Sequence, residues 1–178
     1  SGSTVRGFVI NRFGLHLIQL AGSNNNVIAG NYLGTDATGM LDQGAGDSGV
    51  MLSGGASGNR IGGTTTADRN VISGNNYAGV TITGSGTDDN LVLGNFIGTA
   101  ADGSSALGNS SFGVVIYNSP RGNQIGGAAT GAGNVIAYNS RGVIVDANPT
   151  NSLNNAILGN RIFASITLGI DLYPSGVR

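Results

Sequence analysis

Apolar and polar residues alternate along this chain in short segments that recur in a fixed order. Each repeat contains two phrases of the form Asn-x-aliphatic, followed by one phrase of the form Gly-aliphatic-x-aliphatic. Alternation over about four residues, bounded by Gly, Asn, Thr or Asp, predicts a short strand with one buried side. The first Asn phrase opens at Asn26, Asn59, Asn90, Asn123 and Asn155, the second at Asn31, Asn70, Asn95, Asn134 and Asn160, and the Gly phrase at Gly14, Gly49, Gly79, Gly113, Gly142 and Gly169.

The order of these phrases predicts the fold. The first phrase returns after three strands, so each coil has to lie on the previous coil and run in the same direction. Stacked coils of this kind form parallel strands about 4.8 Å apart, and the handedness preference of parallel crossovers favours a right-handed path. We therefore expect an all-β fold, a single-stranded right-handed parallel β-helix of about five to six coils, with three short strands per coil and little or no helix.

The Gly phrase also predicts which side chains fill the interior. Its second and fourth residues are aliphatic in every coil, and full burial of each contributes about 1.5 to 3 kcal/mol. The Asn columns are expected to stack as amide ladders, because Asn suits tight bends and its amide can bond to the next coil. The residues expected to face inward are Leu15 and Leu17, Val50 and Leu52, Val80 and Ile82, Val114 and Ile116, Val143 and Val145, and Ile170 and Leu172.

Two kinds of coil alternate, which gives a longer period of about 64 residues, from Asn59 to Asn123. Length variation confined to two positions of a repeat predicts loops on two corners of a rigid scaffold. The inserts are residues 63–69 and 127–133 between the two Asn phrases, and residues 35–48 and 99–112 before the Gly phrase.

Aromatic residues follow the second Asn phrase in three coils, at Tyr32, Phe96 and Phe163. We expect these three side chains to occupy equivalent outward positions. An exposed row of rings could bind sugar, but the long inserts beside Tyr32 and Phe96 could equally fold over them.

The composition excludes several functional classes. The chain has 178 residues with no Cys, one His and a formal net charge of -1, and neither Lys nor Glu occurs. So little positive charge gives no electrostatic footprint for nucleic acid or for an anionic membrane surface. No segment approaches the roughly 18 consecutive apolar residues of a membrane-spanning helix, so membrane insertion is not expected.

We expect residues 1–178 to form a single β-helix domain. Neither end carries the atypical capping unit that covers the open end of a solenoid, so we also expect the chain to be a piece of a longer solenoid. Open strand edges at both ends would favour end-to-end self-association.

The segments IGGTTTADRNVISGN, GNYLGTDATG and GNFIGTAADG, each followed by a Gly phrase, resemble the parallel β-helix repeats of large secreted or surface-attached bacterial proteins. This resemblance covers nearly the whole chain and implies the fold of the pectate lyases. It also implies an extracellular or cell-surface location and a polysaccharide or cell-surface glycan as partner. The same fold serves polysaccharide lyases, glycoside hydrolases, epimerases, tailspikes and adhesins, so the resemblance does not select an activity.

Candidate chemistry gathers on the outward positions of the last Gly phrases. Asp146 and Asp171 are expected on adjacent coils at diagonal positions, preceded by Arg141 and flanked by Tyr117 and Tyr173. Two carboxylates about 5 to 9 Å apart are what acid/base cleavage of a glycosidic bond needs, and tyrosines offer flat surfaces to sugar rings. The same carboxylates could chelate Ca²⁺. The alternative is that these residues are ordinary polar positions on a soluble strand face.

Two functional hypotheses follow from these patterns. The first is a noncatalytic extracellular module that acts as a stalk, an adhesin or a carbohydrate-contacting scaffold. The second is a polysaccharide lyase or glycoside hydrolase that uses Asp146 and Asp171. Neither needs a cofactor, apart from the Ca²⁺ that the carboxylates could hold. His16, the single histidine, is expected on the solvated surface and too distant from these carboxylates to join them.

Overall fold

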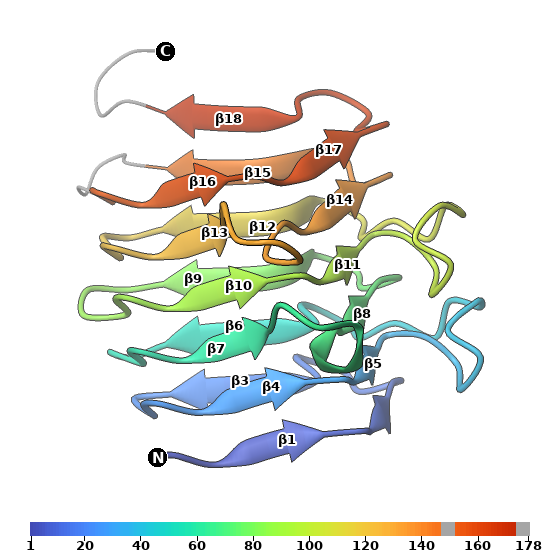
Figure 1. Ribbon diagram of the computed structural model, residues 1–178, viewed down its shortest axis with the longest axis horizontal. Coiled ribbons are helices and arrows are strands. Elements are labelled where there is room, and N and C mark those ends of the chain that lie inside the picture. The colour runs from blue at the N-terminus through green and yellow to red at the C-terminus, as the bar shows by residue number, and fades with distance from the viewer. Residues whose placement is uncertain (147–151, 174–178) are drawn as a thin grey trace.

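The computed structural model describes residues 1–146 and 152–173 and contains three six-stranded parallel sheets (Figure 1). The first sheet consists of β1 (Thr4–Arg6), β4 (Val27–Ala29), β7 (Arg60–Gly62), β10 (Leu91–Leu93), β13 (Gln124–Gly126) and β16 (Ala156–Leu158). The second consists of β2 (Val9–Ile10), β5 (Tyr32–Leu33), β8 (Val71–Ile72), β11 (Phe96–Ile97), β14 (Val135–Ala137) and β17 (Arg161–Phe163). The third consists of β3 (Ile18–Ala21), β6 (Val50–Ser53), β9 (Ala78–Thr83), β12 (Phe112–Tyr117), β15 (Arg141–Asp146) and β18 (Ile170–Tyr173).

Successive strands therefore enter the three sheets in rotation, and the chain forms a parallel β-helix of six coils. In Figure 1 the first sheet runs left to right in front and the third runs right to left behind while the chain climbs, which is a right-handed path. Within residues 1–146 and 152–173, the single helical element is the 3₁₀ turn η1 (Thr66–Asp68). The described part of the chain contains no helix that is both long enough and apolar enough to span a membrane.

The interior is an aliphatic column, as the Gly phrase predicted. Val114 pairs with Val80 on one side and with Val143 on the other, and all three side chains are fully buried. The corresponding Ile, Leu and Val residues of the other strands join them in one continuous hydrophobic cluster, with the exception of Ile170 and Leu172 in β18. Because each side chain is covered by its equivalents on the neighbouring coils, the core extends along the axis and gains its stability coil by coil.

The glycines that open the third phrase are required by packing between the second and third sheets. A Cβ on Gly79 would lie 2.6 Å from Cγ2 of Ile97, and a Cβ on Gly113 would lie 2.5 Å from Cγ2 of Ile136. Neither glycine has a positive φ, so the close approach, and not the backbone conformation, demands the absence of a side chain.

The first coil departs from the expected register. Ile18 and Leu20 pair with the inward residues of β6 and occupy the interior, whereas Leu15 is 69% exposed. The prediction that Leu15 lies in the core was wrong, and Leu17 packs only against the margin of the core. A Cβ on Gly14 would meet nothing within 4 Å, so Gly14 does not belong to the packed glycine column. Pairing between strands fixed the register, and the local match to the phrase was misleading.

The interior column is open at the C-terminal end. Ile170 and Leu172 face inward, yet they are 48% and 64% exposed because no described coil covers them. Leu158, Ile166 and Leu168 are exposed beside them. End-to-end self-association through such edges stays a prediction.

The Asn columns form the expected amide ladders. In the first ladder the main-chain N–H and the Nδ2 of each Asn both donate to Oδ1 of the Asn on the next coil, from Asn26 through to Asn155. The second ladder repeats this from Asn31 to Asn160. A third ladder, which the sequence patterns did not reveal, consists of Asn75, Asn109 and Asn139.

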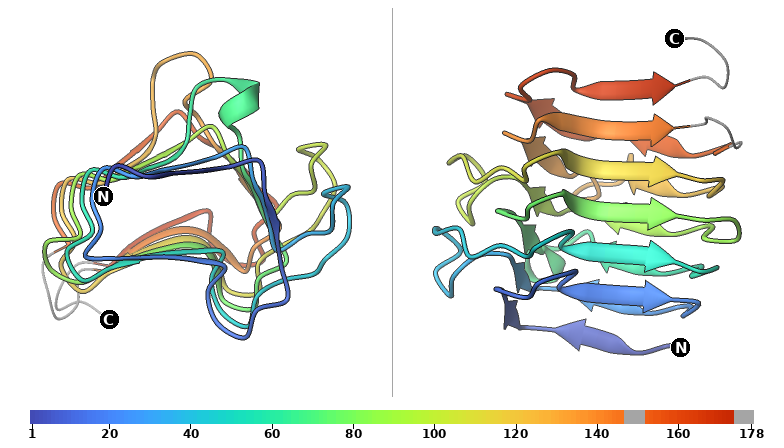
Figure 2. Two further views of the ribbon diagram at one scale, coloured as in Figure 1. Left: turned by 90° about the horizontal axis from the view of Figure 1, so that it is seen from below. Right: turned by 180° about the vertical axis from the view of Figure 1, so that it is seen from behind.

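The inserts occupy two corners, as expected, and project beyond the stacked coils (Figure 2). The two long inserts stack on each other through the Ala101 N–H, which donates to Gly39 O. They also cover aromatic rings: a Cβ on Gly39 would lie 3.0 Å from the Tyr32 ring, and a Cβ on Gly103 would lie 2.5 Å from the Phe96 ring. Covered packing of Tyr32 and Phe96 was therefore the correct alternative.

The third aromatic residue of the expected row lies elsewhere. Phe163 pairs with Ala137, whereas the residue in the column of Tyr32 and Phe96 is Arg161. The expected equivalence of Phe163 with the other two rings was wrong, because Phe163 stands two residues further along its strand.

Candidate functional site

The outward side of the third sheet gathers most of the residues that could act on a ligand. In the ribbon this sheet bows toward the axis of the β-helix (Figure 2). Its outward positions form a column in which Met51, Thr81, Val115, Ile144 and Asp171 follow one another by strand register. We call this side of the sheet the outer face.

The middle of the outer face is a second, small hydrophobic core. Val115 and Ile144 are only 4% and 3% exposed although they point away from the interior. Tyr77, Phe112 and Tyr117, which we call the aromatic cluster, pack against them. These two outward positions are therefore covered, because the neighbouring rings pack on them.

Contacts within the aromatic cluster are specific. The rings of Tyr77 and Phe112 meet edge to face, with centroids 5.2 Å apart and planes at 88°. Burial raises the pKa of the Tyr77 hydroxyl above its usual 10.0, and the nearby Tyr117 and Asp47 raise it further. Tyr77, Phe112 and Tyr117 are each half-buried.

The expected carboxylates lie at the C-terminal end of the outer face. Asp171 pairs with Ile144 and Asp146 with Tyr173, so Asp146 and Asp171 are diagonal neighbours on β15 and β18. This offset corresponds to about 8 Å between their Cα atoms. Arg141 lies on the same face, with Nη1 at 3.8 Å from Asp171 Oδ2. Their catalytic roles stay predictions.

The environment of Asp171 is enclosed. Its side chain is 12% exposed, and among the described residues Oδ2 accepts no hydrogen bond and is shielded from solvent. The guanidinium of Arg141 is the positive group that faces this oxygen. Asp171 is thus held as an ion-paired carboxylate in the protein surface, with one oxygen turned away from solvent.

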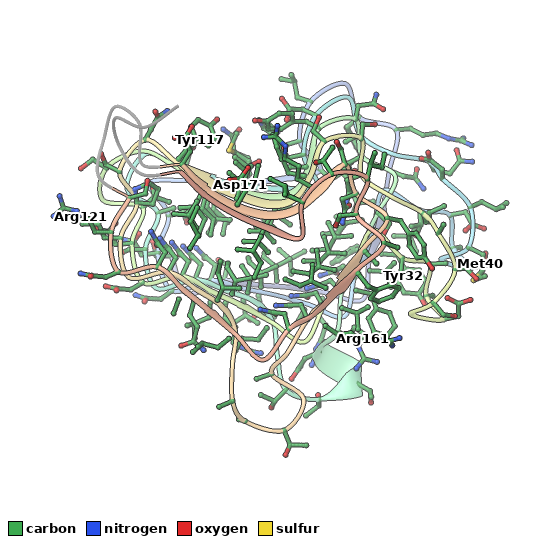
Figure 3. The ribbon with its side chains drawn as sticks, turned by 90° about the horizontal axis from the view of Figure 1, so that it is seen from above. Tyr32, Met40, Tyr117, Arg121, Arg161 and Asp171 are labelled. Carbon is green, nitrogen blue, oxygen red and sulfur yellow. The ribbon has the colours of Figure 1, made fainter. Side chains whose placement is uncertain are left out.

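The two expected sugar-contacting tyrosines differ in how far the structure describes them. Tyr117 pairs with Thr83 and lies on the same outer side of the sheet as Asp171 (Figure 3). Tyr173 ends β18, but its side chain lies outside the described residues. Their roles in substrate binding stay predictions.

A polar group that the sequence did not single out lies beside the aromatic cluster. Ser48 Oγ donates to Asp47 Oδ1 at 2.8 Å and is 2.9 Å from Thr81 Oγ1. Because Ser48 has one hydroxyl proton, Thr81 supplies the proton of the second bond. His16 Nδ1 accepts the Ser48 N–H at 3.4 Å and lies 3.5 Å from Asp47 Oδ1. This group joins the first coils through hydrogen bonds.

The prediction that His16 is a solvated surface residue was wrong, since its side chain is 14% exposed. It lies beside Asp47 and Ser48 at the N-terminal end of the outer face, whereas Asp146 and Asp171 lie on β15 and β18 at the C-terminal end. Across the parts of the chain that the structure describes, no three His, Cys, Asp or Glu side chains gather as a metal site. A Ca²⁺ ion on Asp146 and Asp171 would therefore need other oxygen ligands.

The sequence did contain a signal for the aromatic cluster. Residues 112–117 and 141–146 carry aliphatic side chains at both inward and outward positions, which is typical of a strand that is covered on both faces. Phe112 stands one residue before a Gly phrase and Tyr77 two residues before the preceding one, at the edge of the sheet that such a cover would occupy.

Comparisons with known proteins found no match for this chain among protein families, curated proteins or solved structures.

Proposed function

We propose that this chain is a noncatalytic β-helix module of a secreted or surface-attached bacterial protein, which acts as a stalk, an adhesin or a carbohydrate-contacting scaffold. The observation that carries the proposal is the state of Asp171, whose Oδ2 is shielded from solvent and faces Arg141 at 3.8 Å. A general acid or base must reach the bond that it cleaves with an accessible oxygen. Asp171 offers little of this access.

The scaffold part of the proposal is supported by continuity along the axis. Two amide ladders and one aliphatic cluster extend through the coils, and the ladder amides of the central coils are fully buried. Each coil contacts only its neighbours, so the length of such a rod grows with the number of coils. A rigid rod of this kind suits a stalk or a surface that displays a binding face. The extracellular bacterial setting rests on the resemblance of the repeats.

Product analysis tests the noncatalytic assignment. The protein is incubated with neutral and uronate polysaccharides, and new reducing ends and unsaturated products are measured. We expect neither product to accumulate. Accumulation that is lost in the double variant Asp146→Asn with Asp171→Asn would instead establish the alternative, a polysaccharide lyase or glycoside hydrolase that uses these carboxylates. Accumulation that survives the double variant would place the chemistry elsewhere on the chain.

Binding assays test the contact role. A glycan array and a pulldown with bacterial cell-wall polysaccharide report whether the module recognises a polysaccharide or a cell-surface glycan. Binding without product formation supports an adhesin or a carbohydrate-contacting scaffold. If no glycan in a broad panel binds, the proposed function is reduced to that of a stalk. The surface location is tested by labelling intact cells with an antibody against this protein, because the antibody cannot enter the cell.

A further inference from the structure

We propose that the aromatic cluster on the outer face is the binding platform for a linear neutral polysaccharide, and that charged polysaccharides such as polyuronates are excluded from it. This inference rests on the proposed function, because it names the surface and the ligand class of a carbohydrate-contacting module. The observations that carry it are the partly exposed rings, the polar groups at both ends of the cluster, and the sign of their charges.

The rings supply the apolar surface that sugar binding needs. Tyr77, Phe112 and Tyr117 are fixed by packing on Val115 and Ile144 beneath them. The edge-to-face contact between Tyr77 and Phe112 fixes these two rings relative to each other. Rings that are already ordered lose little conformational freedom when a ligand stacks on them, which favours binding. Tyrosine adds a hydroxyl that can bond to the sugar while the ring contacts its apolar face.

Polar side chains flank the rings along the axis of the β-helix. Asp47, with 36% of its side chain exposed, lies toward the N-terminal coils, and the Tyr77 N–H donates to its main-chain oxygen. Arg141, with 35% exposed, lies toward the C-terminal coils. Coils repeat every 4.8 Å or so, a spacing similar to the length of a pyranose ring. A chain of sugars that follows the axis would therefore meet rings in the middle and hydrogen-bonding groups on both sides.

Charge decides between neutral and acidic sugars. Among the described residues, the outer face carries the carboxylates of Asp47 and Asp171, and the guanidinium of Arg141 faces Asp171. Carboxylates accept hydrogen bonds from sugar hydroxyls, but they repel the carboxylates of a polyuronate. The face therefore suits a neutral polymer.

Affinity electrophoresis tests the ligand class. The intact protein is run through native gels that contain laminarin, xyloglucan, galactomannan or polygalacturonate. We expect retardation by at least one of the three neutral polymers and none by polygalacturonate. Free migration through all three neutral gels would overturn the proposal, as would retardation by polygalacturonate. Product formation, which tests the proposed function, is measured separately, so either result can fail without the other.

Substitutions of tyrosine test the platform. Tyr117→Ala is expected to weaken binding of the retarding polymer about tenfold, the change that 1.4 kcal/mol of lost contact produces. Tyr117→Phe keeps the ring and should bind within about twofold of the parent. Tyr138→Ala is the matched control, since Tyr138 contacts Phe163 and Ser104 and lies outside the aromatic cluster. Unchanged binding by Tyr117→Ala would contradict the proposal.

A measurement on the unaltered protein removes any dependence on how the variants fold. Amide chemical shifts are followed while the retarding polymer, or an oligosaccharide of it, is added. Perturbations are expected to concentrate in residues 77–83, 112–117 and 141–146. Perturbations confined to the long inserts or to the first sheet would place the binding site elsewhere and overturn the proposal.

Discussion

The main-chain N–H and the side-chain Nδ2 of Asn59 both donate to Oδ1 of Asn90, each at 2.9 Å. Asn90 repeats this arrangement toward Asn123, and its Nδ2 also donates to the main-chain oxygen of Ala56. Asn90 is fully buried, so water cannot take the place of these partners. One side chain therefore links the coil below it to the coil above it.

Replacement of Asn90 by Leu should destabilise the protein. The main-chain N–H of Asn59 loses its acceptor in the interior, and an unpaired buried group costs about 1 to 3 kcal/mol. Denaturant unfolding followed by circular dichroism measures the change. Asn76→Leu is the control, because Asn76 is exposed, and its effect should stay within about 0.5 kcal/mol. An Asn90→Leu variant as stable as the parent would remove the ladder as a source of stability.

Two glycine substitutions should differ sharply. A Cβ on Gly113 would lie 2.5 Å from Cγ2 of Ile136 and 2.6 Å from the main-chain oxygen of Gly142, so Gly113→Ala is expected to cost about 1 to 3 kcal/mol. Gly14→Ala meets nothing within 4 Å and should change stability by less than about 0.5 kcal/mol. Thermal melting of the two variants gives the comparison. Equal melting temperatures would contradict the packing that we assign to the glycine column.

Acid should loosen the second long insert through Asp102. Hydrogen bonds from the hydroxyl and N–H of Ser105, and then from the N–H of Ser104, lower the pKa of Asp102 from 3.8 to about 2. Because the folded-state pKa is depressed, the contribution of Asp102 to stability is present above pH 3.8 and is lost as the pH falls through about 2. Carboxyl carbon chemical shifts measure the midpoint. In Ser105→Ala the midpoint should move back toward 3.8, and a parent midpoint already at that value would refute the assignment.

Alkali should act on the aromatic cluster through Tyr77. Burial is the main cause of its raised pKa, followed by Tyr117 and Asp47. The unfolded chain loses this proton at about pH 10.0 while the folded protein still holds it, so the stability that Tyr77 contributes falls as the pH rises above 10.0. Unfolding midpoints measured below and above this pH should show the loss, and Tyr77→Phe should reduce it. A parent and a Tyr77→Phe variant with the same alkaline dependence would contradict this role.

Much of the fold could be predicted from the sequence because each coil repeats the same Asn and Gly phrases. Asn26, Asn59 and Asn90 mark equivalent bends, and Val80, Val114 and Val143 mark equivalent interior positions. Stacking brings equivalent residues together, so a periodic sequence directly gives periodic contacts. The phrase at Gly14 misled because a local pattern cannot report which residues the neighbouring strand pairs with.

The candidate site was harder to predict because it depends on contacts between residues that share no pattern. The diagonal placement of Asp146 and Asp171 could be predicted from strand register alone. The enclosure of Asp171, the cover that Tyr77 and Phe112 place over Val115, and the approach of His16 to Asp47 required side chains from several coils to meet. None of these side-chain contacts repeats from coil to coil, so the periodicity of the sequence does not predict them.

The sequence by itself determined the coil, its three strands, the aliphatic column and two of the three amide ladders, because those features depend on residue type at a fixed spacing. Only the tertiary structure decided which outward side chains reach solvent. The exposure of a side chain depends on which neighbouring loops and rings cover it. Ile144 is therefore only 3% exposed, whereas Leu15, which is also aliphatic, is 69% exposed.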